Sequence, residues 1–222
     1  MNAPKLTFFH APQSRSGGTL ALLEELGVDY ELQLLDLKAG TQRDPAYLAL
    51  NPLGKVPAIR HGDAMVTEQP AVMMYLADLY AEKGLAPAIG DPLRGPYLRW
   101  MVFYGSCFEP ALVDRSLQRE PAPHMTSPYG SWQEVLDAIV AQLTPGPWLL
   151  GERFTAADLT FACLAAAVVV PPEYGVKLPQ PEDLPEPVRG DIERFRAHPA
   201  GVYALELFEK RRANAFTQRP AS

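Results

Sequence analysis

Residues 51–59 read Asn51-Pro52-Leu53-Gly54-Lys55-Val56-Pro57-Ala58-Ile59, and no other stretch says as much about the fold. Proline cannot donate to a sheet ladder, so we expect Pro57 just before a short strand over 58–61. A cis Val56–Pro57 bond is typical of a tight turn. Such a turn would leave the backbone N–H and C=O of Val56 free to pair with an extended, peptide-like ligand. The alternative is a plain loop between a helix and a strand.

Upstream of this stretch, the pattern predicts a strand, a helix and a second strand. Residues 5–9 are short and β-prone, and residues 30–34 alternate between apolar and polar side chains. Between them, leucines in 19–27 recur at helical spacing, and Ser14 or Ser16 is a natural N-cap. A strand, a helix and a strand in this order make a βαβ unit with a parallel pair.

Downstream, the pattern predicts a short helix, a hairpin and a longer helix. Residues 44–50 begin with a proline in the first helical turn. Residues 58–61 and 64–67 are short strands joined by a tight turn. A helix follows over 70–82. Residues 1–83 therefore form the first domain, which is of the α/β class.

Beyond residue 83 the composition changes. Residues 84–90 have the proline and glycine content of a linker, and no strand pattern follows in 91–222. Thr155 and Asp158 match a capping box that opens a helix apolar on nearly every face, the expected centre of an all-helical second domain. The other helices are expected over 97–117, with a bend at Glu109-Pro110, and over 131–143, 188–197 and 202–212.

Composition and charge exclude several classes of function. A chain of 222 residues is long enough for two domains, and a net charge of −6 without a dense Lys/Arg patch argues against nucleic-acid binding. Cys107 and Cys163 fall in helical patterns and resemble core residues rather than a metal site. The most apolar run, 159–170, is too short to span a bilayer, and no signal-peptide core is found. We expect a soluble cytoplasmic protein with no metal and no membrane partner.

Taken together, these features resemble the cytosolic glutathione S-transferases, specifically a bacterial, serine-type member. The pieces that match are Ser14-Arg15-Ser16, residues 22–27, residues 51–57, Thr67-Glu68 and residues 154–158. They follow one another in the family's order over nearly the whole chain. The resemblance implies a thioredoxin-like, glutathione-binding first domain and a helical second domain that carries a pocket for an electrophile.

The resemblance also implies how glutathione is held. The backbone of Val56, beside a cis Pro57 and next to Lys55, would pair with the cysteinyl part of the ligand. Glu68 would bind the ammonium of its γ-glutamyl end, and the next residue would bind the carboxylate there. That residue is usually Ser, and here it is Gln69. Lys38 would reach the glycine carboxylate of the ligand. The alternative for Lys38 is a solvated position in a loop.

For catalysis, the family's serine-type members place a hydroxyl at the start of the first helix. Ser14 matches best and Ser16 second, with pure N-capping as the alternative for Ser14. Cysteine-type members have a Cys where this chain has Arg15, and tyrosine-type members have a Tyr where it has Phe8-Phe9. Arg15 is a further candidate, which would stabilise the thiolate or an acidic co-substrate.

The electrophile pocket would lie against the start of the long helix. The candidates are Arg99, Phe103 and Tyr104, with His10 facing them from the end of the first strand. Core or dimer packing is the alternative for the helix residues, and an ordinary loop position is the alternative for His10.

The function implied by the resemblance is glutathione transfer. The glutathione thiolate would attack a small hydrophobic electrophile, or reduce a peroxide, in detoxification. The expected enzyme is a homodimer with glutathione as co-substrate. A protein that kept the fold and binds glutathione or a hydrophobic ligand without turnover is the alternative.

Overall fold

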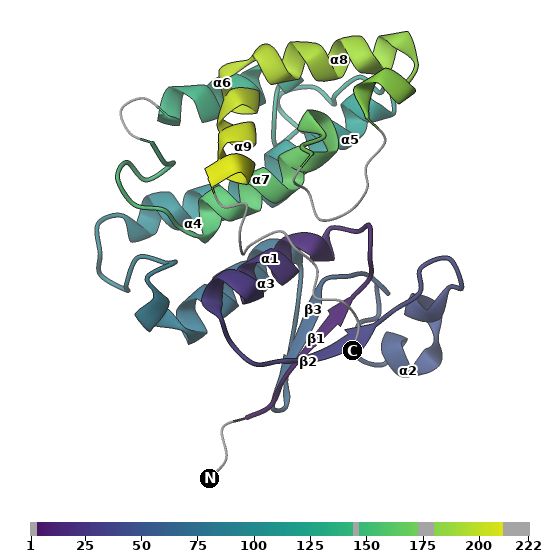
Figure 1. The fold of residues 1–222 in the computed structure, drawn as a ribbon, viewed down its shortest axis with the longest axis vertical. Helices are drawn as coiled ribbons and strands as arrows, with labels where there is room; N and C mark the ends of the chain where they lie inside the picture. Colours follow the sequence, from purple (N-terminus) through teal and green to yellow (C-terminus); the bar gives the residue numbers. More distant parts are fainter. Residues whose placement is uncertain (1–3, 144–146, 173–179, 211–222) are drawn as a thin grey trace.

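The computed structural model describes residues 4–143, 147–172 and 180–210, without the side chains of Pro187 and Lys210. It has two layers: a sheet with its own helices, and a bundle of helices packed on them (Figure 1). The predicted class is confirmed, because a thioredoxin-like first domain is followed by a helical second domain.

The sheet has four strands in the order β2-β1-β3-β4. They are β1 (Leu6–His10), β2 (Glu31–Leu34), β3 (Ala58–His61) and β4 (Ala64–Thr67). β1 pairs in parallel with β2 and antiparallel with β3, and β3 pairs antiparallel with β4. The predicted βαβ unit and hairpin are both confirmed.

The alternation of β1 divides the apolar side chains between two cores. Leu6 and Phe8 belong to the main core, under α1 (Ser16–Leu26) and α3 (Gln69–Leu79). Phe9 points to the other face and packs with Tyr47 of α2 (Pro45–Leu48). Successive residues of a strand face opposite sides of the sheet, so one short strand supports both layers.

The start of α1 differs from the prediction. The N-cap residue is Arg15, and no side chain caps the helix in the usual way. Instead, the N–H of Ser16 donates to Ser14 Oγ over 3.2 Å. Ser14 therefore accepts from a first-turn amide, while its carbonyl accepts from Gly17 N–H at 3.0 Å.

The helical domain contains six α-helices within the described residues. These are α4 (Arg94–Phe103), α5 (Glu109–Ser116), α6 (Trp132–Leu143), α7 (Ala156–Val169), α8 (Glu186–Ala197) and α9 (Pro199–Lys210). The single bent helix predicted over 97–117 is two helices joined by the π-helical turn η3 (Tyr104–Phe108). Pro110 lies two residues beyond its end, and its missing N–H leaves the carbonyl of Ser106 without the regular i→i−4 donor. Short 3-10 turns lie at η1 (Thr41–Arg43), η2 (Ala81–Lys83) and η4 (Pro181–Asp183).

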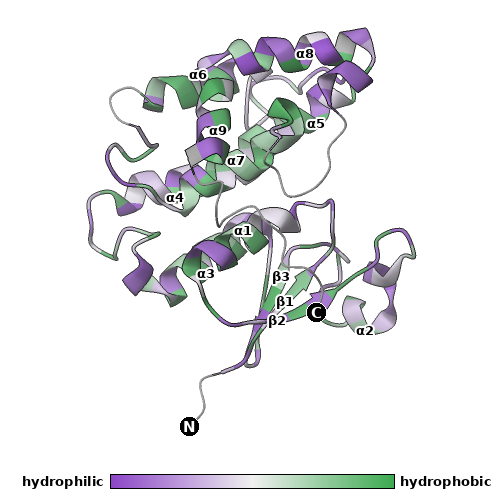
Figure 2. Cartoon of the chain, in the orientation of Figure 1, coloured by the Kyte–Doolittle hydropathy of each residue, from purple (hydrophilic) through white to green (hydrophobic). Residues whose placement is uncertain are grey.

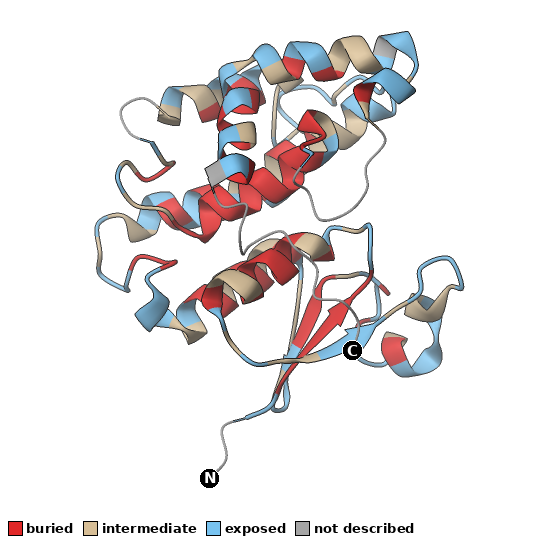
Figure 3. Cartoon of the chain, in the orientation of Figure 1, coloured by how far each residue is buried: buried red, intermediate tan, exposed pale blue. Residues whose placement is uncertain are grey.

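Helix α7 is the centre of the second domain. It is mostly apolar in Figure 2 and buried along nearly its whole length in Figure 3. Its predicted capping box is confirmed, since Thr155 Oγ accepts from Ala157 N–H and Asp158 accepts from Thr155 N–H. Asp158 also accepts from Leu149 N–H at 2.8 Å and from the hydroxyl of Tyr203.

The segment expected to be a linker is fastened to both layers. Leu85 and Ala86 are buried, and the carbonyl of Leu85 accepts from Ala156 N–H at 2.8 Å. Arg94 makes a two-pronged ion pair with Asp78 of α3, with both N–O distances 2.6 Å. One hydrophobic core runs from the sheet through α1 and α3 into α7.

Candidate functional site

A cleft of about 510 Å³ lies between the first domain and the junction of α4 with α5. Several predicted site residues line it: Ser14, Arg15, Lys55, Val56, Pro57, Glu68 and Gln69. The rest of its lining comes from Gln13, Leu37, Gln42, Arg43, Asn51, Gly54, Pro70, Gly105 and Glu109. Five segments that are separate in the sequence therefore meet at one cleft.

The loop before Pro57 is held rigidly on its inner side. The Val56–Pro57 bond is cis, as predicted. The carbonyl of Lys55 accepts from Tyr47 OH at 2.6 Å and from Asn51 Nδ2 at 2.9 Å. Within the part of the chain that the structure describes, the backbone of Val56 makes no turn or loop hydrogen bond. The peptide groups of Val56 therefore remain available at the cleft.

Gly54 shows how tightly this loop is folded. Its φ is +58°, a left-handed value that favours glycine. A Cβ at this position would lie 2.6 Å from the carbonyl oxygen of Gln42 and 3.2 Å from the guanidinium of Arg43. The glycine lets the loop and the 3-10 turn approach each other, and this brings Arg43 to the cleft.

Ser14 lies just before the N-terminus of α1 and is partly exposed to the cleft. Its hydroxyl donates to the carbonyl of Ala11 at 2.7 Å. It also lies 2.7 Å from Ser16 Oγ, which in turn lies 2.7 Å from Nδ1 of His10. Ser14 is thus the outer end of a row of polar groups that runs inward from the cleft.

The corner between β4 and α3 carries an unusual backbone. Glu68 has φ +66°, which is strained for a residue with a side chain, and its carboxylate is exposed at the cleft. Gln69 follows as the first residue of α3 and is buried. The Nε2 of Gln69 has no hydrogen-bond partner, and a Cβ on Gly18 of α1 would lie 2.5 Å from it. The Gln69 side chain therefore packs against α1.

Arg15 and Glu109 close one side of the cleft. They form an ion pair between the start of α1 and the start of α5, with side-chain exposures of 50% and 28%. The pair joins the first domain to the second beside Ser14. Sequence reasoning identified Arg15, and it missed Glu109 because nothing local links positions so far apart.

Two predicted residues lie behind the cleft. Ser16 is fully buried, and His10 is only 3% exposed. Burial lowers the pKa of His10 to about 4. The prediction that His10 faces an electrophile is therefore corrected: β1 ends under α1, so its last side chain points into the core. Lys38 is exposed and is not part of the cleft lining.

The residues predicted on the long helix also lie elsewhere. Tyr104 is fully buried and packs at 5.8 Å from the ring of Phe161, so it does not line an open pocket. Arg99 stacks on Trp100, with its Cζ 3.7 Å from the ring centroid, and Phe103 packs on the same ring at 5.1 Å. The helix turns these side chains toward the core and a separate surface. Gly105 and Glu109 reach the cleft instead.

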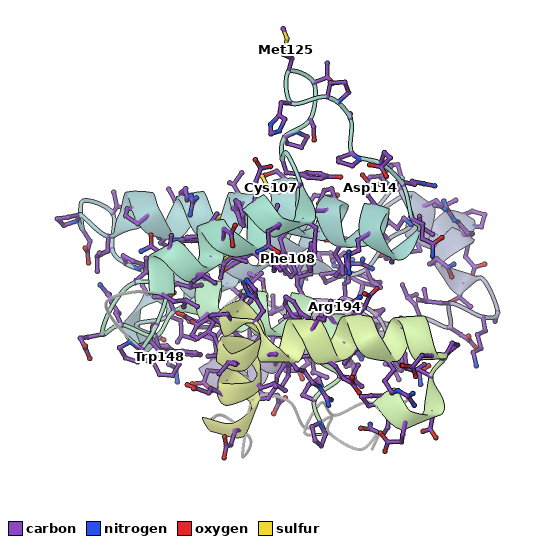
Figure 4. The ribbon with its side chains drawn as sticks, turned by 90° about the horizontal axis from the view of Figure 1, so that it is seen from above. Cys107, Phe108, Asp114, Met125, Trp148 and Arg194 are labelled. Atoms are coloured by element: carbon purple, nitrogen blue, oxygen red, sulfur yellow. The ribbon has the colours of Figure 1, made fainter. Side chains whose placement is uncertain are left out.

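A larger cavity, of about 970 Å³, lies within the helical domain between α5, α7 and α8. Asp114 on α5 and Arg194 on α8 lie on its lining, at the places labelled in Figure 4. None of the predicted site residues reaches it. The hydroxyl of Ser14 and the free peptide groups of Val56 meet in the smaller cleft.

Comparison with known proteins agrees with this geometry. Residues 4–78 match the family model "Glutathione S-transferase, N-terminal domain", and residues 129–198 match the C-terminal one. Glutathione S-transferase F10 of Arabidopsis thaliana is 32% identical over 166 residues, covering 69% of this chain and 76% of that protein. The chain belongs to the glutathione S-transferase family.

Solved structures of the glutathione S-transferase family have the same architecture. A glutathione transferase from Methylococcus capsulatus has a TM-score of 0.61 at 28% identity, covering 92% of this chain and 99% of that one. A sphingomonad glutathione S-transferase complexed with glutathione has a TM-score of 0.59 at 26% identity, covering 90% and 98%. The likeness extends over both layers of the fold.

Two further findings concern the described residues of this family member. The described residues contain no group of three or more His, Cys, Asp or Glu side chains placed to hold a metal ion. None of their helices combines the length and the apolar character that a bilayer span requires.

Proposed function

We propose that this protein is a glutathione transferase of the serine type, with Ser14 as its catalytic residue. The thiolate of bound glutathione attacks an electrophilic carbon, an S–C bond forms, and the leaving group departs with its electron pair. The observation that carries the proposal is the meeting of the Ser14 hydroxyl with the free Val56 peptide in one cleft.

The lining suggests a position for each part of glutathione. The N–H and C=O of Val56 would pair with the cysteinyl residue, as when an extended peptide adds to a sheet edge. The Glu68 carboxylate would bind the γ-glutamyl ammonium, and the amides at the start of α3 would bind its carboxylate. Arg43 and Lys55 line the cleft and would bind the glycine carboxylate in place of Lys38.

One hydroxyl is sufficient for the activation of the thiol. A free thiol has a pKa of about 8.5, so lowering it by about 2 units requires about 2.7 kcal/mol of preference for the thiolate. A hydrogen bond to an anion supplies about 1.5–3 kcal/mol. The positive end of the α1 dipole adds about 0.3–1 kcal/mol. Ser14 at the start of α1 therefore meets the requirement.

Retention and turnover test the proposal together. The protein should bind immobilised glutathione and conjugate glutathione to a generic aryl halide. Ser14→Ala should still be retained, since Val56 and Glu68 remain, and its turnover should fall. Ser116→Ala is a matched control, because its hydroxyl donates to Val113 O at the exposed end of α5.

The outcomes distinguish a glutathione transferase from a binding protein with the same fold. Retention without turnover of any aryl halide or peroxide would favour a binding protein with the transferase fold. A wild-type protein that is neither retained on immobilised glutathione nor able to conjugate it would overturn the proposal. Equal turnover in Ser14→Ala and Ser116→Ala would remove Ser14 from its catalytic role.

We also propose a homodimer that acts on reactive electrophiles in a reducing compartment such as the cytoplasm. Leu98 and Val102 are exposed one turn apart on α4, with 37% and 57% exposure, and an apolar stripe of this kind suits a partner subunit. Cys107 and Cys163 are free thiols, as is usual where disulfides do not persist. Light scattering of wild type and Val102→Glu would test the dimer, which the charge should dissociate.

A further inference from the structure

A row of three polar side chains leads from the cleft into the first domain. Ser14 Oγ lies 2.7 Å from Ser16 Oγ, and Ser16 Oγ lies 2.7 Å from His10 Nδ1. Two backbone groups join the row. The carbonyl oxygen of Ala11 lies 2.7 Å from Ser14 Oγ and 3.1 Å from Ser16 Oγ, and the N–H of Ala11 donates to Ser16 Oγ at 3.1 Å.

Counting hydrogens gives this row one direction. Ser14 lies 2.7 Å from a carbonyl oxygen, so its single hydrogen is donated to Ala11. Ser16 Oγ lies 2.7 Å from Ser14 Oγ and 3.1 Å from the carbonyl of Ala11, so its hydrogen goes to the nearer oxygen, that of Ser14. The contact of Ser16 with His10 needs a hydrogen on Nδ1, because the hydrogen of Ser16 is already used.

The same count fills every lone pair on the two serine hydroxyls. Ser16 Oγ accepts from His10 Nδ1–H and from Ala11 N–H. Ser14 Oγ accepts from Ser16 O–H and from Ser16 N–H. A hydroxyl oxygen has two lone pairs, so Ser14 has no place left for another proton. Of the hydrogens in the row, that of Ser14 is the one that can turn from Ala11 toward a ligand in the cleft, because Ser16 and His10 are buried behind it.

The environment keeps His10 in the state that the row needs. The side chain is 3% exposed, and the ring of Phe8 lies 5.4 Å from its ring. Burial, with no contribution from a charged side chain, lowers the pKa of His10 to about 4. The imidazole is therefore neutral at pH 7 and carries one N–H.

We propose that His10 and Ser16 are positioning residues that restrict Ser14 to donating its hydrogen bond to the glutathione sulfur. The inference rests on the proposed role of Ser14. Bonds that run in one direction polarise one another, so the two inner donors make Ser14 a stronger donor. Ser14 does not act as a general base, and the thiol proton passes to solvent water.

The tautomer of His10 tests the inference in the unaltered protein. Nitrogen-15 NMR of the histidine rings should show the neutral Nδ1–H form for His10 at pH 7. The chain has four histidines, so His10→Asn identifies the signal by its loss. A neutral Nε2–H form, or a charged ring at pH 7, would overturn the inference.

Variants test the effect on the sulfur. We expect His10→Leu to raise the pKa of the enzyme-bound thiol by about 0.5 unit, roughly a threefold fall in its acid dissociation constant. Thiolate absorbance against pH measures it. The KM for glutathione should stay unchanged, and kcat should fall. His10→Asn, whose amide N–H can replace Nδ1–H, should restore the pKa. A rise in the KM for glutathione as large as the fall in kcat would indicate that His10 has only a structural role.

A control and a second comparison separate the possible failures. Thr19→Val removes a buried hydroxyl without a partner from the same helix, so it should leave the thiol pKa unchanged. The charged residues that line the cleft beside Ser14 are the same in all variants: Arg15, Arg43, Lys55, Glu68 and Glu109. If Ser14→Ala raises the thiol pKa and His10→Leu does not, the inference fails alone. If Ser14→Ala has no effect, the proposed role of Ser14 fails.

Discussion

Two helix starts in this molecule use serine or threonine hydroxyls in opposite ways. At α7, Thr155 and Asp158 form a buried capping box whose partners are all internal. At α1, the hydroxyl of Ser14 lies partly open to the cleft, and no side chain caps the helix in the usual way. A polar network that is fully enclosed stabilises the fold, whereas one that ends at a cleft has a donor left for a ligand.

The contrast is clearest in what each network leaves unused. Both carboxylate oxygens of Asp158 accept hydrogen bonds from the backbone, and one also accepts from Tyr203. Burial raises the pKa of Asp158, and these donors oppose that shift. In the Ser14 network, the one hydrogen bond that can be redirected is the one to Ala11.

The largest effect should come from the closed network. Asp158→Ala leaves the amides of Leu149 and Thr155 buried without an acceptor, so we expect a loss of about 3–4 kcal/mol in the free energy of unfolding. Urea denaturation measures it. The specific activity of the folded fraction should stay near that of the wild type. The exposed Asp137 gives a control, since Asp137→Ala should cost about 0.5 kcal/mol or less.

In the Ser14 network, we expect a substitution to lower activity and to leave stability nearly unchanged. Ser14→Ala removes a hydrogen bond to the thiolate, so kcat should fall about 10- to 100-fold. Its free energy of unfolding should change by less than about 1 kcal/mol, because Ser14 is partly solvated. Steady-state kinetics and urea denaturation of the same sample give both values. A large loss of stability with unchanged kcat would make the two helix starts alike.

A third site combines strain and binding in one residue. Glu68→Gly relieves a backbone with φ +66°, so we expect a gain of about 1 kcal/mol in the free energy of unfolding. Affinity for glutathione should fall about tenfold or more, because the carboxylate is lost. Glu68→Gln separates the two effects, since it removes the charge and keeps the strain. Calorimetry of glutathione binding and thermal unfolding measure them.

The smallest effect is a dependence of stability on pH. His10 binds a proton near pH 6.5 when unfolded and near pH 4 when folded, so the unfolded chain takes up the proton first as the pH falls. Stability from this group is complete above about pH 6.5 and is lost toward pH 4. Between pH 7 and pH 6 the loss should be about 0.7 kcal/mol. His10→Asn should lack this component in paired urea titrations.

Local signals predicted most of the fold. Pro57 before an apolar run, the hairpin at 58–67 and the Thr155–Asp158 capping box each depend on neighbours within a few residues. Each is present in the structure. The π-helical turn was not foreseen, because Pro110 predicts a disturbance in the helix and not its type.

The site was predictable only where it is made of backbone and short loops. Ser14, Val56 and Glu68 line the cleft because each follows or precedes a strand at the same end of the sheet. The helix side was not predictable, since a small change in helical phase decides whether Tyr104 or Gly105 reaches the cleft. The ion pair of Arg15 with Glu109 depends on how the two domains pack, which no local pattern encodes.

A crystal structure of the protein with bound glutathione tests the account most directly. We expect the sulfur within hydrogen-bond distance of Ser14 Oγ, with the cysteinyl backbone paired to Val56. The Ser14 hydroxyl should still lie beside Ser16 Oγ. A sulfur nearer to Arg15 than to Ser14, or a glutathione bound outside this cleft, would contradict it.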